Sequence, residues 1–393
     1  MIEPHKNKLL FSLILSVCAI VPLTNDIFIS GITQMTQYFP GSNISLVLSV
    51  SLLGLAISQT FYGPLSDRFG RKPVLLIGLI IYTVMSAIVT FSTSFYLLLL
   101  GRFIQAVGAC SAIVSALAIA RDCYSKENLV SATSMIMAIL GAGPAFAPLI
   151  GSFLNNYWGW RASFGFLFVL GLAYTLLIYF SFDETHKHKN MQALSIKSII
   201  RNYYVLGKNL KFLTYCSTSG LSYGVLFSYI ALSSLFIIEK LGYSLIQFGI
   251  MVAFNALAII VMSTFSPKIT RKISLDGAMC LGAAVICCGG LIMWALNTIW
   301  GLSIYTFMIP IFITTVGIGM IRPTASAGAM SQVERNVAGS AAAFFNFFSF
   351  VAGSFATVIA SRTVEHAASF GLFIALMGLC ALLFNKVNRF KML

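Results

Sequence analysis

Apolar stretches about as long as a membrane-crossing helix recur along the whole of this chain and leave room for little else. A helix needs about 20 mostly apolar residues to cross a bilayer, and 58% of the 393 residues are hydrophobic. Only 9% are charged, whereas about 25% are charged in soluble domains. This composition excludes an ordinary soluble enzyme, a disordered chain and a nucleic-acid-binding domain.

Hydropathy divides the sequence into twelve candidate membrane helices. Most connections between them are short, but one long, basic segment divides the chain into six helices plus six. The sequence therefore predicts an all-α membrane protein with twelve transmembrane helices in two six-helix bundles, 1–182 and 212–393, joined by a basic cytoplasmic linker at 183–211. The expected helices are 9–31, 44–65, 74–92, 95–120, 129–154, 161–182, 212–238, 245–266, 277–297, 301–321, 337–360 and 367–385.

Positive charge alternates between the connections of this arrangement. The segments on the side of the N-terminus hold 21 of the 25 lysines and arginines, and the opposite loops hold 3. By the positive-inside rule, both termini are expected in the cytoplasm. The net charge of +14 then orients the protein and faces anionic lipid head groups, and we expect no nucleic-acid partner.

The sequence contains no motif for a metal, a cofactor, ATP binding or catalysis. The eight cysteines lack C-x-x-C spacing, and no cluster of histidine, cysteine and carboxylate has metal-ligand spacing; we expect no metal and no cofactor. There is no phosphate-binding loop, which favours an ion gradient over ATP. A hydrolase would need a base inside the membrane, but no histidine or lysine lies within the expected helices. A channel would need a ring of charges or a carbonyl filter, and the sequence resembles neither. We therefore expect no enzyme.

Two formal charges, Asp26 and Arg102, fall inside the expected helices, and Asp26 belongs to the polar stretch Thr24–Asp26 that interrupts the first of them. A charge at the bilayer centre costs roughly 2.5–3.5 kcal/mol on insertion scales, so neither is expected to face lipid. Three explanations are open: the two side chains or their neighbours only satisfy one another inside the bundle, Asp26 lies in the outer membrane interface, or Asp26 alternates between a protonated and a charged form. Desolvation favours the neutral acid and a nearby cation favours the carboxylate, so a conformational change could bind or release a proton.

The range 141–151 is rich in glycine, alanine and proline. Small residues let helices approach closely, and two prolines four residues apart favour a bend. This segment is either a packing seam with a static kink or a stiff hinge at the interface of the two halves. Its key positions are Gly141, Gly143, Pro144, Pro148 and Gly151.

Several of these stretches resemble the major facilitator superfamily, specifically its drug:proton antiporters with twelve spans. Residues 63–73 are similar to the signature between its second and third helices, 97–108 to its helix 4 signature, and 141–151 to its helix 5 antiporter signature. Asp26–Ile29 and Arg322–Gly328 resemble the bicyclomycin-resistance (Bcr/CflA) branch. The resemblance implies the major facilitator fold and efflux of small molecules in exchange for protons, by alternating access around a central cavity.

Carried over to this chain, the resemblance implies that Asp26 is the protonation site and that Arg102 couples the proton to the cavity. It further implies a conformational latch that holds the cytoplasmic ends together in the outward-open state, formed by Gly63, Asp67, Gly70, Arg71 and Lys72. Some drug antiporters have a second carboxylate two turns beyond the first, but this chain has Gln34 there. That difference argues against a proton stoichiometry above one and against divalent cationic drugs.

Polar and aromatic residues within the expected helices are candidates for the substrate cavity. An aromatic cavity with a few polar anchors suits amphiphilic compounds, and ring faces together with Asp26 would favour cations. With 33 phenylalanines in the chain, many of these side chains are equally explained by packing. The candidates are Asn25, Asp26, Gln105, Tyr223, Phe227, Tyr229, Asn255, Phe344, Asn346 and Phe347.

The sequence therefore predicts a multi-pass transporter of the bacterial inner membrane. It would be a proton-coupled antiporter that exports small organic, amphiphilic or drug-like molecules, and it would function as a monomer in contact with membrane lipid. The alternative is a dedicated exporter of one endogenous metabolite, such as a siderophore or an amino-acid derivative, because the same fold and coupling residues would serve it.

Overall fold

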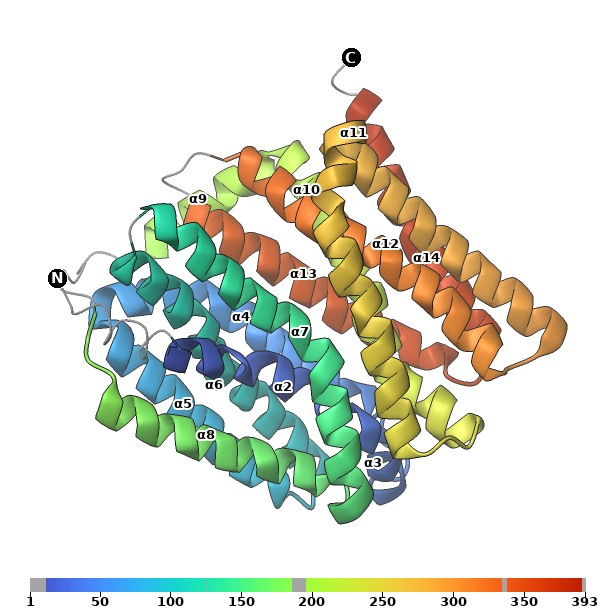
Figure 1. The fold of residues 1–393 in the computed structure, drawn as a ribbon, viewed down its shortest axis with the longest axis horizontal. Helices are drawn as coiled ribbons and strands as arrows, with labels where there is room; N and C mark the ends of the chain where they lie inside the picture. Colours follow the sequence, from blue (N-terminus) through green and yellow to red (C-terminus); the bar gives the residue numbers. More distant parts are fainter. Residues whose placement is uncertain (1–11, 125, 186–195, 334–337, 391–393) are drawn as a thin grey trace.

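The computed structural model describes residues 12–124, 126–185, 196–333 and 338–390, and every secondary-structure element within them is a helix (Figure 1). The first group of helices comprises a first span at Ser12–Tyr38 that contains α2 (Ile20–Asp26), η1 (Ile29–Gly31) and α3 (Ile32–Tyr38). It continues with α4 (Ser45–Phe69), α5 (Arg71–Thr90), α6 (Phe95–Cys123), α7 (Lys126–Trp158) and α8 (Arg161–Ser181). We call this group the first bundle.

The second bundle follows a short helix, α9 (Ile196–Lys208). Residues 186–195 of the predicted linker lie outside the described part of the chain. The second bundle consists of α10 (Leu210–Ser234), η2 (Leu235–Lys240), α11 (Leu245–Trp300), α12 (Ile304–Ser331), α13 (Ala338–Ala360), η4 (Ser361–Thr363) and α14 (Ala367–Phe390).

Where the structure describes them, all twelve predicted ranges lie on helices, although two of them share one element. The described residues contain ten helices that are long and apolar enough to cross a membrane. The predicted helices 245–266 and 277–297 both lie in α11, which has 56 residues and is broken by a non-helical Ser274 with φ 68°. A straight helix of that length would measure about 84 Å, roughly twice the thickness of a bilayer. The chain therefore reverses at Ser274, as Figure 1 shows.

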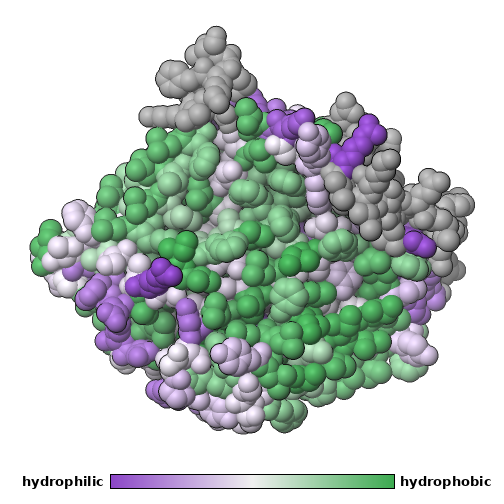
Figure 2. Space-filling view, turned by 180° about the vertical axis from the view of Figure 1, so that it is seen from behind, coloured by the Kyte–Doolittle hydropathy of each residue, from purple (hydrophilic) through white to green (hydrophobic). Residues whose placement is uncertain are grey.

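The outer surface explains why these helices need a membrane. Large apolar side chains remain exposed on many helices, among them Ile77 (58%), Val169 (62%) and Phe180 (78%). Figure 2 shows apolar side chains across the middle of one face and hydrophilic ones gathered toward two opposite ends. Water does not tolerate a continuous apolar surface of this kind on a soluble monomer. The all-α membrane fold predicted from the sequence is confirmed.

The two bundles meet along two helix pairs, α4 with α13 and α7 with α11. Two hydrogen bonds join the first pair: Ser354 Oγ donates to the Ser49 carbonyl (2.9 Å) and Asn43 Nδ2 donates to Ser361 Oγ (3.0 Å). Both lie at the end of α4 that is remote from the α4–α5 connection at Gly70. At this end the bundles are in direct contact.

Candidate functional site

The first span is broken immediately after Asp26. The helix α2 ends at this residue, a short 3₁₀ segment follows at Ile29–Gly31, and the α-helix resumes at Ile32. A 3₁₀ turn in the middle of a span often marks a functional hinge. The predicted interruption at Thr24–Asp26 and the observed break therefore lie in the same place.

Glycines of α7 hold this broken segment in position. A Cβ added at Gly143 would lie 2.6 Å from Pro22 Cγ, and one added at Gly151 would lie 2.6 Å from the Ile27 carbonyl carbon. Because both positions lack a side chain, α7 packs directly on the Pro22 ring before Asp26 and on the Ile27 backbone after it. The glycine face is thus a seam within the first bundle. Pro148 is buried, whereas the side-chain surroundings of Gly141 and Pro144 lie outside the described residues.

The same helix also faces the second bundle. A Cβ at Gly249 of α11 would lie 2.6 Å from Ser152 Oγ and 3.2 Å from Leu149 Cα of α7. The helix α7 therefore touches both α2 and α11, so a shift of the second bundle can reach the segment around Asp26.

The Asp26 carboxyl group lies in an interior with few polar partners. The residue is only 3% exposed, and Oδ1 accepts no hydrogen bond from the described residues. Two arginines act on it electrostatically, Arg102 from the first bundle and Arg322 from the second. An unbonded carboxylate oxygen in such a place carries a large desolvation cost, which protonation removes.

Arg102 is completely buried on α6 among aromatic rings. Its guanidinium carbon lies 4.6 Å from the centroid of the Phe28 ring and 5.5 Å from that of Phe164. Nη1 donates to Gln105 Oε1 (2.7 Å), and Gln105 Nε2 donates onward to Ser86 Oγ (2.7 Å). Nε and Nη2 have no hydrogen-bond acceptor among the described residues. The cation is held in place while two of its donor groups remain available.

Arg322 lies inside a membrane helix, which corrects the sequence analysis. The helix predicted at 301–321 left Arg322 in a cytoplasmic loop, but α12 continues to Ser331. The sequence stretch beyond Arg322 is small and apolar enough to extend the helix, and the guanidinium gains a partner inside the bundle. Its Nη2 donates to the hydroxyl group of Tyr223, and its carbon lies 4.4 Å from the centroid of that ring.

The predicted latch residues form a charge network within the first bundle. Arg71 is buried, and its Nη1 donates to Asp67 Oδ1 (2.6 Å) while its Nε donates to Asp122 Oδ2 (2.8 Å). Gly70 has a φ of 108°, which suits glycine at this turn. Lys72 Nζ donates to the Tyr179 carbonyl (3.0 Å), and Gly63 has open space around it.

A glutamate that sequence reasoning missed completes this network. Glu184 accepts hydrogen bonds from the backbone N–H groups of Arg71 (3.0 Å) and Lys72 (3.2 Å). A carboxylate at the N-terminus of α5 accepts hydrogen bonds from the free N–H groups of the helix and interacts favourably with the positive end of the helix dipole. The residue lies more than 100 positions from its partners in the sequence, so no local pattern pointed to it.

The predicted cavity residues do not form one group. Asn25 accepts a hydrogen bond from Ser51 Oγ (3.0 Å), and Gln105 is occupied by Arg102 and Ser86. Within the second bundle, Asn255 is buried and accepts from Thr315 Oγ1 (3.0 Å). Tyr229 is also buried, and Asn346 and Phe347 are partly buried.

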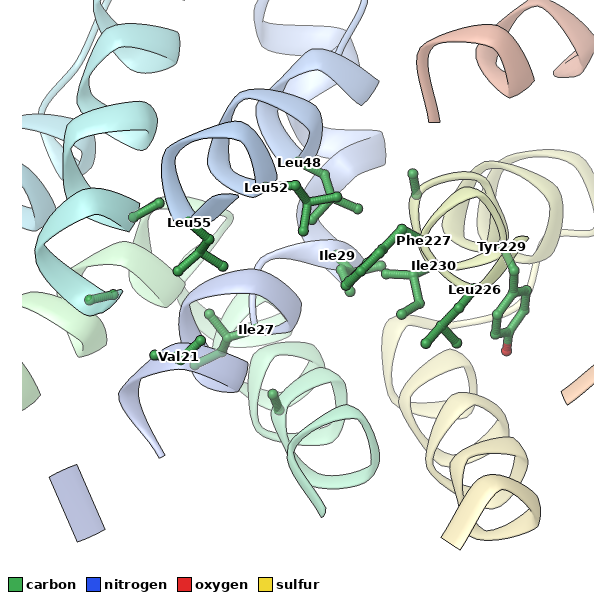
Figure 3. Packing of buried hydrophobic residues seen from close by; sticks show 14 of the residues in the cluster. Val21, Ile27, Ile29, Leu48, Leu52, Leu55, Leu226, Phe227, Tyr229 and Ile230 are labelled. Carbon is green, nitrogen blue, oxygen red and sulfur yellow. The ribbon is translucent and has the colours of Figure 1, made fainter. Parts of the chain in front are cut away.

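The predicted aromatic residues Tyr223 and Phe227 lie on α10, which contacts η1 of the first bundle. The Tyr223 and Phe227 rings are 5.5 Å apart. Figure 3 shows Ile29 of η1 pointing toward Phe227 and Ile230. Phe344 lies elsewhere, with its ring 5.5 Å from Tyr203 of α9 and 5.7 Å from Phe212. The structure therefore places Asp26, Tyr223 and Phe227 near the bundle interface, whereas Phe344 belongs to a separate ring cluster with Tyr203 and Phe212.

Comparison with known proteins decides the family. Residues 14–357 match the sequence profile of the Major Facilitator Superfamily. The chain belongs to this superfamily. It is 26% identical to a bicyclomycin resistance protein homolog of Haemophilus influenzae, covering 96% of this chain and 95% of the relative. It is 28% identical to multidrug resistance protein D of Escherichia coli over the same shares of each.

A solved structure shares the fold of this chain. The crystal structure of a D-xylose-proton symporter superposes with a TM-score of 0.74 over 96% of this chain and 97% of that one, at 15% identity. As a member of the Major Facilitator Superfamily, the chain is a transporter and not an enzyme. It is a multi-pass protein of the bacterial inner membrane that carries a small-molecule substrate.

Proposed function

We propose that this facilitator protein exports small organic, amphiphilic or drug-like molecules from the cell in exchange for protons. Its relatives named for resistance to bicyclomycin and to multiple drugs support export of such compounds. The observation that carries the proton coupling is Asp26: a buried carboxyl group at a helix break, with an oxygen that has no partner among the described residues. One chain contains both bundles, so a monomer suffices.

In this mechanism, the charge on Asp26 couples to the relative position of the bundles. The ionised carboxylate is attracted to Arg102 and Arg322, which belong to different bundles. Protonation removes the attraction to both and the cost of burying the charge. Movement of the second bundle changes how strongly Arg322 acts on Asp26, and the free energy of binding a proton changes with it. A proton gradient can thereby drive the bundles through alternating access.

The conformation described here fits one stage of that cycle. Asn43 and Ser49 hold the second bundle at one end of α4, while Arg71 at the other end bonds to Asp67 and Asp122 of its own bundle. With the predicted orientation, the joined end faces outward and the latch end faces the cytoplasm. In the opposite conformation, we expect the Asp67 end to join the second bundle and the Asn43 end to separate.

The proposal is tested with everted membrane vesicles that hold a preformed pH gradient. Adding bicyclomycin should dissipate the gradient, because each exported molecule moves against at least one proton. Asp26→Asn should fold normally and abolish this response, whereas Glu239→Gln, which changes an exposed carboxylate on η2, should leave it intact. If vesicles with the Asp26→Asn variant lose the pH gradient at the wild-type rate, the proposed role of Asp26 is refuted.

A further inference from the structure

Arg322 and Tyr223 form a fixed cationic group on the second bundle. The guanidinium lies over the Tyr223 ring at 4.4 Å and also donates to its hydroxyl group. The Tyr223 ring packs against Phe227 (5.5 Å) and Phe350 (5.7 Å). Arg322 is only partly buried, in contrast to the fully buried Arg102. The charge is therefore held rigidly above an aromatic surface while part of it stays accessible.

This group belongs to the part of the second bundle that meets the first. A Cβ added at Gly353 would lie 2.9 Å from Phe227 and 3.5 Å from Leu52 of α4. The η1 segment, which begins three residues after Asp26, packs against α10 (Figure 3). The ring cluster of Tyr223, Phe227 and Phe350 thus lies close to the interface that holds Asp26, and the charge of Arg322 acts on the Asp26 carboxylate.

The balance of charge in this region is positive. Two arginines, Arg102 and Arg322, act on one carboxylate, Asp26. The position two turns further along the first span is Gln34, so it adds no negative charge. With Asp26 ionised, one positive charge remains uncompensated among these groups, and with Asp26 protonated both remain. A permanent cation entering here meets repulsion in either state, which is strongest where water is scarce.

We propose that Arg322 determines substrate specificity and selects amphiphiles that carry no permanent positive charge. Its guanidinium donates to an acceptor or anionic group of the substrate, while the apolar part of the substrate lies on the ring cluster of Tyr223, Phe227 and Phe350. This inference rests on the export function proposed above and narrows its substrate class. It reverses the expectation from the sequence that aromatic rings and Asp26 favour cations.

A purely structural role for Arg322 makes a different prediction. If the residue only ties α12 to α10 through Tyr223, its loss weakens the binding of every ligand equally. If it selects by charge, its loss changes the ratio of affinities between a cationic and an uncharged ligand that share an apolar core. The test therefore measures that ratio in the purified full-length chain.

Tetraphenylphosphonium and triphenylphosphine oxide suit this measurement because they share a triphenylphosphorus core. The first is a permanent cation, and the second is uncharged with a strong acceptor oxygen. We expect the wild-type protein to bind the oxide more tightly, and Arg322→Gln to shift the ratio toward the cation by about tenfold, equivalent to about 1.4 kcal/mol. The matched control is Arg362→Gln, which removes an exposed arginine of the same bundle and should leave the ratio unchanged.

A second variant keeps the test decisive if Arg322→Gln does not fold. Tyr223→Phe retains the ring but removes the acceptor for Arg322, so it frees a donor and should increase the preference for the oxide. A structural tie predicts equal weakening of both ligands instead. The inference is overturned if the wild-type protein prefers the cation or binds neither ligand, or if the folded variants keep the wild-type ratio. Because equilibrium binding needs no gradient, selectivity without proton movement would remove the antiport proposal and leave this inference standing.

Discussion

At the scale of single residues, the interior of the first bundle contains charges that are poorly satisfied. Arg102 is fully buried, with two donor groups that have no acceptor among the described residues, and Asp26 Oδ1 accepts no hydrogen bond there. Burying such groups lowers stability unless every partner is supplied. Their presence in an otherwise apolar core is best explained by a task that needs a changing charge.

Replacing Arg102 by an apolar residue of similar length should therefore separate stability from function. We expect Arg102→Met to leave the melting temperature unchanged or to raise the free energy of unfolding by about 1–4 kcal/mol, because it removes an incompletely paired buried cation. Proton-linked export should be lost. Thermal unfolding in detergent and the vesicle assay measure the two effects, and a strongly destabilised Arg102→Met variant would show that the arginine serves the fold instead.

At the scale of elements, the close contact between α2 and α7 depends on residues without side chains. Gly143 faces Pro22 and Gly151 faces Ile27, so these glycines position the helix break next to the buried Asp26. The sequence left two explanations open for this pattern, a seam or a hinge between the halves. The contacts place the glycines against α2 and the neighbouring Leu149 and Ser152 against α11.

Filling this seam should damage the protein. Gly151→Ala inserts a methyl group into the Ile27 carbonyl, and we expect a loss of about 1–3 kcal/mol in the free energy of unfolding together with reduced export. Gly207→Ala is the matched control, because nothing lies within 4 Å of a Cβ at that position on α9. Unfolding monitored by circular dichroism gives the comparison; equal stability of the two variants would argue against a close seam.

The cap on α5 allows a second test at this scale. Glu184→Gln removes the negative charge that faces the N-terminus of the helix, which should cost about 0.3–1 kcal/mol. We expect faster hydrogen exchange at the backbone amides of Arg71 and Lys72, with unchanged exchange at the centre of α5. Unaltered exchange at these two amides would mean that Glu184 does not stabilise the turn in solution.

At the scale of the whole molecule, two bundles are joined at one end by contacts such as Asn43 with Ser361. Alternating access requires these contacts to break in each cycle. Locking them should therefore stop transport without disturbing either bundle.

A reversible cross-link provides the measurement. In a background without the native cysteines, Asn43→Cys combined with Ser361→Cys should form a disulfide on oxidation and block export, and reduction should restore it. Asn43→Cys alone should transport under both conditions. Full export by the cross-linked protein would show that this end stays closed throughout the cycle.

Several features could be predicted because they depend on local composition. The helical membrane fold follows from the apolar runs of the sequence, and the break at Asp26 follows from the polar stretch that interrupts the first of them. The prediction failed where a charge was taken as the end of a helix. Arg322 interrupts the apolar run of α12, but the helix continues past it, and the Tyr223 hydroxyl group accepts a hydrogen bond from the guanidinium. The partners of Arg71 were only partly predictable, since Asp67 lies one turn away whereas Asp122 and Glu184 come from distant segments.

By itself, the sequence determined that this protein lies in a membrane and is helical. In a bilayer, apolar runs of about 20 residues can satisfy their backbone hydrogen bonds only as helices. It also showed that Asp26 and Arg102 are costly charges. Only the tertiary structure decided which charges act on one another, since Arg322 reaches the neighbourhood of Asp26 through the packing of one bundle against the other. Electrostatic interactions depend on distance in space, and helices nearly 300 residues apart in the chain become neighbours only in the folded protein.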